Sequence, residues 1–178
     1  YQRQGTPLVS ILIPNKDQAD TLRTCIESIR KKCTYPAFEI LVIENNSTEE
    51  ATFSYYKELE AQGIRVLQYP KQGFNYSAIN NFGVREAKGE YLLFLNNDME
   101  VITPDFMEKM VSNLQRPKIG AVGAKLYYPD NTVQHAGIIL GIGGIAGHAF
   151  LGLGRGKSGY LHKASLQMNV SAVTAACM

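Results

Sequence analysis

Apolar residues follow two different patterns, which alternate along the chain. Short runs rich in β-branched residues, such as LVSILIP at 8–14 and FEILVIE at 38–44, predict strands that are buried on both faces of a parallel sheet. Between these runs, apolar residues recur at the spacing of one face of a helix that ends near residue 32. They are Leu22, Cys25, Ile26 and Ile29.

The alternation continues as far as residue 128. It predicts strands at 65–69, 91–95 and 119–128, and helices at 47–62, 76–87 and 103–114. Typical helix starts precede the helices: Asp17 with Asp20, Ser47 with Glu50 as a capping box, and Thr103 before Pro104. Strands that alternate with helices favour a mostly parallel sheet with helices on both faces, which is a three-layer α/β fold.

The length of 178 residues suits one domain. We treat 1–178 as a single domain in which 7–130 form the core and 131–178 form an incomplete, glycine-rich segment. Residues 131–178 contain no Asp or Glu, and VSAVTAACM at 170–178 has the apolar pattern of a strand without a polar tail. We therefore expect a domain that is cut before its natural end.

Composition narrows the class of protein. A net charge of +2, from 18 basic and 16 acidic residues, gives no reason to expect a nucleic-acid partner. The three cysteines form no CxxC pair, which favours a reducing, cytoplasmic compartment. No apolar run reaches the roughly 20 residues of a membrane helix. We expect a cytoplasmic protein, and the inner face of the membrane is the alternative location for the full-length protein.

Polar residues follow four of the predicted strands at the point where each strand ends. Because ligands of parallel sheets bind beyond the carboxyl ends of the strands, these residues predict a binding site. Its amides suit a nucleobase or ribose, its lysines suit phosphate, and its aspartate suits Mg²⁺ or Mn²⁺, although an aspartate at a strand exit also commonly caps a turn. The four sets are Pro14-Asn15-Lys16, Glu44-Asn45-Asn46-Ser47, Pro70-Lys71-Gln72-Gly73 and Asn96-Asn97-Asp98.

Four segments, in this order, resemble the nucleotide-binding, N-terminal part of a family 2 glycosyltransferase with the GT-A fold. They are VSILIPNKDQADTLRTCIESI, FEILVIENNS, AKGEYLLFLNND and AVGAKLYYPDNTVQHAG. The resemblance covers residues 7–178, and FLNND takes the place of the family's DxD metal motif. It implies transfer of a sugar from a nucleotide-diphosphate sugar to a hydroxyl of a saccharide or lipid-linked saccharide, with Mg²⁺ or Mn²⁺ as cofactor, in bacterial surface polysaccharide synthesis.

The resemblance also implies roles for individual residues. Pro14, Asn15 and Lys16 would line the base and ribose pocket, and Glu44 and Asn45 would read the base. Asn75, Asn80 and Asn97 would face the donor, and Asp98 would be the metal ligand. Two departures stand out, because members often have two acids or an acid and an amide where this chain has Glu44-Asn45, and Asn96 replaces the first acid of DxD. The NND variant is similar to rhamnosyltransferase-like bacterial enzymes.

Several alternatives stay open. Inverting members of the family take a general base from a later acidic motif, and no residue here is assigned to that role. The chain could therefore be a sugar-nucleotide-binding module without transfer activity. A nucleotidyltransferase would share the sheet but should have a glycine-rich, basic loop after the first strand, where this chain has PNKDQAD.

The remaining signals favour ordinary structural roles. GIGGIA at 141–146 matches a dinucleotide-binding fingerprint without its acidic partner, which favours a loop or ribbon. The spacings of 13 and 14 residues between His135, His148 and His162 match no zinc motif, so we predict loop or surface histidines. Tyr55 and Tyr56 are assigned to helix packing and the surface.

Overall fold

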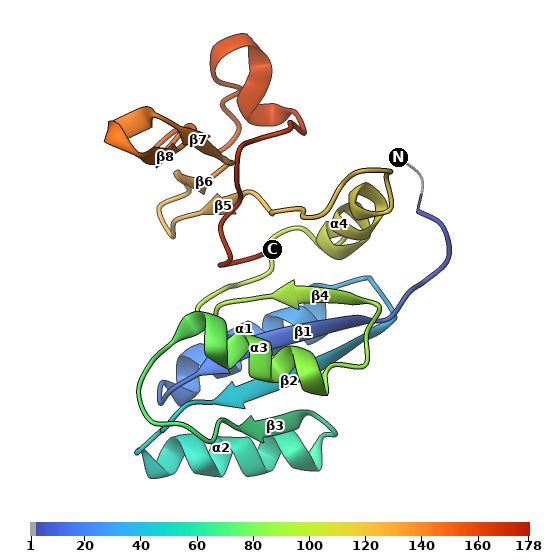
Figure 1. Cartoon of the computed structure of the whole chain (residues 1–178), viewed down its shortest axis with the longest axis vertical. Helices are drawn as coiled ribbons and strands as arrows, with labels where there is room; N and C mark the ends of the chain where they lie inside the picture. The colour runs from blue at the N-terminus through green and yellow to red at the C-terminus, as the bar shows by residue number, and fades with distance from the viewer. Residues whose placement is uncertain (1–2) are drawn as a thin grey trace.

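A four-stranded parallel sheet in the order β3-β2-β1-β4 forms the centre of the protein in this computed structural model, which describes residues 3–178 (Figure 1). The strands are β1 (Val9–Asn15), β2 (Phe38–Glu44), β3 (Arg65–Gln68) and β4 (Tyr91–Phe94). β1 and β2 pair along their whole length, so that Asn15 lies opposite Glu44 at the carboxyl end. The predicted parallel sheet is confirmed.

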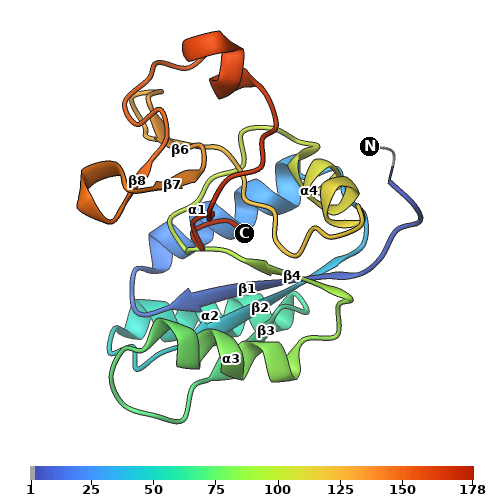
Figure 2. The same ribbon diagram turned by 45° about the horizontal axis from the view of Figure 1, so that its top comes forward.

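Four long helices cover the two faces of the sheet. They are α1 (Ala19–Lys32), α2 (Glu50–Ala61), α3 (Tyr76–Glu86) and α4 (Phe106–Leu114). Alternate side chains of β1 divide the core, since Ile11 and Ile13 pack with α1, α2 and α4 while Leu12 packs with α3. Figure 2 shows α3 across the sheet from α1. The α/β fold with helices on both faces is therefore confirmed, and no helix among residues 3–178 is long and apolar enough to span a membrane.

The predicted helix starts are wrong in detail. Helix α1 begins after Gln18 without a side-chain cap, and α4 begins at Phe106, after the turn that contains Thr103 and Pro104. Ser47 does not cap α2. Instead, Asp17 Oδ1 accepts hydrogen bonds from the backbone N–H groups of Thr48 and Glu49, at 2.7 and 2.9 Å, just before α2 begins. The acid that we assigned to its own helix thus supports the start of the next one.

The predicted strand at 119–128 is also wrong. Only β5 (Leu126–Tyr127) forms there, and it pairs with β6 (Val133–His135) in a separate antiparallel sheet. Gly123 packs against Val173, where an added Cβ would lie 2.6 Å from the Val173 Cβ. The position beside β4 goes partly to the last residues of the chain, because Phe94 and Met178 exchange backbone hydrogen bonds of 2.9 and 3.1 Å.

A second small hairpin pairs β7 (Ile138–Leu140) with β8 (Ala146–His148). A short 3-10 helix at Ile142–Gly144 lies between these two strands, and another at Tyr160–Ser165 follows β8. In Figure 1 these elements lie beyond β4, away from α2 and β3. Residues 141–145 of the GIGGIA motif form the connection between β7 and β8, and residue 146 begins β8, as the loop or ribbon interpretation predicts.

The prediction of surface or loop histidines fails for His135, which is 1% exposed. Its Nε2 accepts hydrogen bonds from the backbone N–H groups of Gly137 and Thr174, both at 3.3 Å. Because Nε2 is an acceptor, the ring proton is on Nδ1, which lies 2.9 Å from Nδ1 of the exposed His148. Burial and, to a smaller extent, His148 lower the pKa of His135. His135 therefore holds the C-terminal segment as a neutral side chain.

Candidate functional site

The carboxyl ends of β1, β2 and β4 meet at one edge of the sheet. The Asn45 backbone N–H donates to the Asn15 carbonyl at 2.8 Å, which joins the ends of β2 and β1. The Asn97 Nδ2 donates to Asn15 Oδ1 at 2.7 Å, which joins the turn after β4 to the end of β1. The Gly73 backbone N–H donates to Asn46 Oδ1 at 3.2 Å, which joins the loop after β3 to the loop after β2. The structure thus brings together all four of the polar sets that the sequence places at strand ends.

Asn15 lies at the centre of this edge and is 3% exposed. Its Nδ2 donates to the Asp17 carbonyl at 2.9 Å and to the Tyr56 hydroxyl at 2.8 Å. Its Oδ1 accepts from Asn97. Both amide hydrogens of Asn15 are therefore used within the protein, and the side chain links β1 to α2 and to the turn after β4.

The loop after β2 is held by buried polar side chains. Glu44 is 4% exposed, and one of its carboxylate oxygens accepts from the Ser47 backbone N–H. The Ser47 hydroxyl accepts from the Asp17 backbone N–H at 2.9 Å and lies 3.3 Å from the Tyr56 hydroxyl. Burial raises the pKa of Tyr56, which keeps this phenol neutral. Hydrogen bonds from Glu49 and then Thr48 lower the pKa of Asp17.

Two buried amide oxygens near the site have no hydrogen-bond partner among the described residues. They belong to Asn45 and Asn80, and each of these side chains is 4% exposed. Asn80 Nδ2 donates to the Tyr76 carbonyl at 2.9 Å, which fixes the other amide atom as the oxygen. An unpaired buried acceptor costs about 1–3 kcal/mol, which an N–H or O–H group from a ligand or a water molecule would offset.

Asp98 is exposed and makes neither a hydrogen bond nor an ion pair with any residue in the range 3–178. The turn-capping alternative for Asp98 is therefore not seen in the structure. The part of the chain that the structure describes contains no cluster of three or more His, Cys, Asp or Glu side chains suited to a metal ion. A cation at Asp98 would therefore need additional oxygen ligands from amides, waters or substrate.

The other predicted residues lie around this edge. Lys16 is exposed and Pro14 is half-buried. Asn75 is the N-cap of α3, where its Oδ1 accepts from the Ala78 backbone N–H at 3.0 Å. The amide nitrogen of Asn75 makes no hydrogen bond with any described residue.

Sequence reasoning missed the part that Tyr56 and Asp17 play in this site. Tyr56 was assigned to packing and the surface, yet its hydroxyl contacts Asn15, and Asp17 was assigned to the wrong helix. No local pattern marks either contact, because Tyr56 is 41 residues from Asn15 and Thr48 is 31 residues from Asp17.

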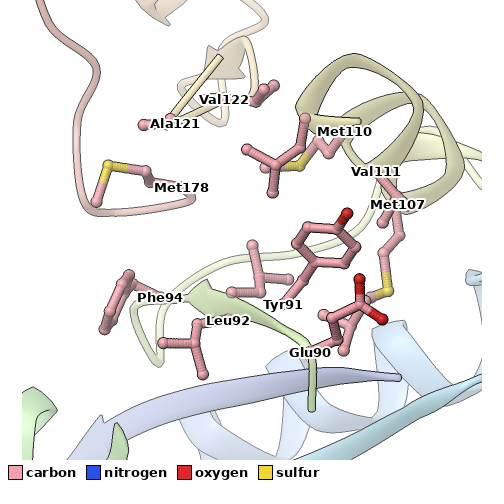
Figure 3. A pocket seen from close by; sticks show the side chains of 14 residues that line it. Glu90, Tyr91, Leu92, Phe94, Met107, Met110, Val111, Ala121, Val122 and Met178 are labelled. Atoms are coloured by element: carbon pink, nitrogen blue, oxygen red, sulfur yellow. The ribbon is translucent and has the colours of Figure 1, made fainter. Parts of the chain in front are cut away.

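An apolar groove lies away from this edge of the sheet. A groove of about 280 Å³ runs along the outer edge of β4 and beside α4, and Figure 3 shows Leu92, Met107, Met110 and Met178 among the side chains that line it. Glu90 is its one charged lining residue among those described. A nucleotide diphosphate requires polar partners, so we do not assign the donor to this apolar groove.

Residues 10–150 match the family model described as Glycosyl transferase family 2. The chain belongs to this family. It is 45% identical over 179 residues to the O-antigen biosynthesis protein RfbC of Myxococcus xanthus, with all of this chain and 14% of that protein covered. It is 46% identical over 180 residues to protein y4gI of Sinorhizobium fredii, with all of this chain and 20% of that protein covered. This family 2 chain thus spans a fifth or less of the length of these two relatives.

Comparison of structures supports the same fold. The chain is similar to the mannosyltransferase PcManGT of Pyrobaculum calidifontis, which was solved in complex with GDP-Man and Mn²⁺. The TM-score is 0.60 at 20% identity, and the match covers 72% of this chain and 38% of that one. At this identity the likeness shows the fold alone, and the predicted GT-A type of fold is confirmed.

Proposed function

We propose that residues 1–178 form the donor-binding part of a glycosyltransferase that uses a nucleotide-diphosphate sugar and a divalent cation. The acceptor is a hydroxyl of a saccharide or lipid-linked saccharide, and the product belongs to bacterial surface polysaccharide synthesis. One observation carries the proposal: Asp98 is exposed and has no partner among residues 3–178, and it follows Asn97, whose side chain is fixed by Asn15 at the carboxyl edge of the sheet.

The base and sugar side of the site would consist of amides. Asn45 Oδ1 and Asn80 Oδ1 are buried acceptors without a partner among the described residues, so each suits an N–H or O–H group of a donor. Glu44 supports this side by closing the turn that carries Asn45. Pro14 and Lys16, on either side of Asn15, are proposed to line the base and ribose, and Asn75 is proposed to face the donor with its free amide nitrogen.

The residues on the β4 side fit a hard divalent cation. Mg²⁺ and Mn²⁺ prefer oxygen ligands and can be held by one carboxylate when waters and a diphosphate complete the coordination. Asp98 would supply that carboxylate. When bound, the cation would act as a Lewis acid toward the departing nucleotide diphosphate. The Mn²⁺ and GDP-Man in the structure of PcManGT support both parts of this proposal.

The chemical step needs a general base for the acceptor hydroxyl. Residues 131–178 hold no Asp or Glu, so we assign no base within this acceptor-side segment. We propose an inverting reaction at the cytoplasmic side of the membrane, with residues 7–130 holding the donor. A second candidate is a donor-binding module without transfer activity. Release of nucleoside diphosphate in the presence of a saccharide acceptor would exclude that candidate.

Calorimetry with UDP, dTDP, GDP and CDP, each with and without Mn²⁺, tests the proposed function. At least one nucleotide should bind, and Mn²⁺ should tighten its binding. Asp98→Ala should remove this tightening. The matched control is Asp105→Ala, because Asp105 is an acid at the start of α4 whose side chain is 49% exposed and pairs with Lys109. A folded protein that binds none of the four nucleotides would overturn the proposal.

A further inference from the structure

The hydrogen bonds around Asn15 fix the direction in which the neighbouring Asn97 amide faces. The Asp17 carbonyl can only accept, so the Asn15 atom 2.9 Å from it must be Nδ2. Asn15 Oδ1 therefore faces Asn97, and the Asn97 atom 2.7 Å away must be its own Nδ2. The positions of the oxygen and nitrogen of Asn97, which follows β4, are thus set by the carbonyl of Asp17, which follows β1.

Other groups use the remaining hydrogen-bonding capacity of Asn15 and hold its partner carbonyl in place. The Tyr56 hydroxyl accepts the second hydrogen of Asn15 Nδ2 at 2.8 Å, and its own hydrogen is left to donate to the Ser47 hydroxyl. The Asp17 carbonyl is held because the Asp17 side chain accepts from two backbone N–H groups before α2. Asn15 and Tyr56 are only 3% and 5% exposed, so water does not compete freely for these bonds.

The consequence concerns the oxygen of Asn97. Among residues 3–178, Asn97 Oδ1 has no hydrogen-bond partner, and it belongs to the residue just before the unpaired Asp98. Turned the other way, Asn97 would direct an NH₂ group, which repels a cation and cannot ligate it, toward the site. A fixed amide avoids this arrangement, just as outer hydrogen bonds orient the ligands of other metal sites.

We propose that Asn15 is a positioning residue that holds Asn97 Oδ1 available as a second protein oxygen for the divalent cation beside Asp98. This inference rests on the proposed function. It assigns Asn15 to the orientation of a ligand, in addition to its place at the edge of the base pocket. It also explains how a chain with Asn96 in place of the first acid of DxD can still offer two oxygens, one charged and one neutral.

The test measures the metal gain, defined as the ratio of the nucleotide dissociation constants without and with Mn²⁺. Asn15→Ala should lower the metal gain roughly 10-fold, the smaller end of the effect of removing an outer partner of a metal ligand. Asn97→Ala should lower it to a similar extent, and the double variant should lower it no further than either single variant. Electron paramagnetic resonance of Mn²⁺ in the presence of the nucleotide, which needs no turnover, should show weaker Mn²⁺ binding in the same variants.

Tyr56→Phe is the matched control. It removes the other side-chain partner of Asn15 but leaves the bonds to the Asp17 carbonyl and to Asn97 in place. It should lower thermal stability and keep the metal gain. If Tyr56→Phe and Asn15→Ala lower the gain equally, the effect is one of general destabilisation and the proposal is wrong.

The proposal also fails if Asn15→Ala keeps the metal gain, or if it lowers the gain by the same factor in the Asn97→Ala background. In both cases a loss of gain in Asp98→Ala would still uphold the proposed function. If Asn15→Ala does not fold, Asn15→Ser replaces it in the same comparison, with the same expected loss. A wild-type chain without any metal gain would overturn the inference together with the metal dependence of the proposed function.

Discussion

Removal of one hydroxyl from Tyr56 gives a quantitative test of the network beneath the site. In Tyr56→Phe, the second hydrogen of Asn15 Nδ2 loses its partner at 2.8 Å while Asn15 stays 3% exposed. A buried donor left unpaired costs about 1–3 kcal/mol, and the longer 3.3 Å contact with Ser47 adds little. The ring keeps its packing, so we expect the free energy of unfolding to fall by about 1.5 kcal/mol.

Tyr55→Phe is the matched control for this change. Tyr55 precedes Tyr56 on α2 and is 3% exposed, but its hydroxyl makes no hydrogen bond with the described residues. Urea denaturation should show a change within about 0.5 kcal/mol for Tyr55→Phe. For Tyr56→Phe, thermal unfolding should shift down by roughly 3–6 °C in a chain of this size. Equal stability of the two variants would refute the view that Tyr56 supports Asn15.

Two further predictions concern the scaffold. Gly89→Ala should lower the free energy of unfolding by about 2 kcal/mol, because a Cβ there would lie 2.5 Å from the Ser10 backbone nitrogen. The control Gly120→Ala, where an added Cβ would have no atom within 4 Å, should be nearly neutral in the same denaturation assay. The pKa of His135 is lower in the folded protein than in the unfolded chain. Below pH 6.5 the unfolded chain therefore binds more protons than the folded protein, and the stability that is present above this pH is lost as the pH falls. In denaturation curves between pH 7.5 and 5, His135→Gln should show a weaker loss than the wild type; equal pH slopes would contradict this role for His135.

The sheet could be predicted because its strands carry their own signal. LVSILIP and FEILVIE are apolar on both faces, as strands between two helical layers must be, and the strand ends then follow from the parallel order. Asn15, Asn97 and Asp98 could be placed at one edge for the same reason. The rule that ligands bind beyond the carboxyl ends needs no knowledge of side-chain contacts.

The errors arise where a distant residue decides the local structure. The capping box at Ser47 was a reasonable prediction, but the Ser47 N–H donates to Glu44 instead. Asp17, in the loop after β1, accepts from the N–H groups of Thr48 and Glu49. The strand predicted at 119–128 does not form beside β4, because Met178 pairs with Phe94 there and Gly123 packs closely against Val173. The orientation of the Asn97 amide depends on a chain of contacts that no spacing in the sequence reveals.

The central claim is that a divalent cation binds with the nucleotide at Asp98, on the carboxyl edge of the sheet. Broadening of amide signals by Mn²⁺ in the NMR spectrum of the nucleotide-bound protein tests it most directly, since the effect is confined to nuclei near the ion. We predict that the signals of Asn97, Asp98 and Asn45 are lost first, while that of Gly89, at the amino end of β4, is kept, and that Asp98→Ala abolishes the effect. Broadening centred on His135 and His148, or along the groove beside β4, would contradict the account.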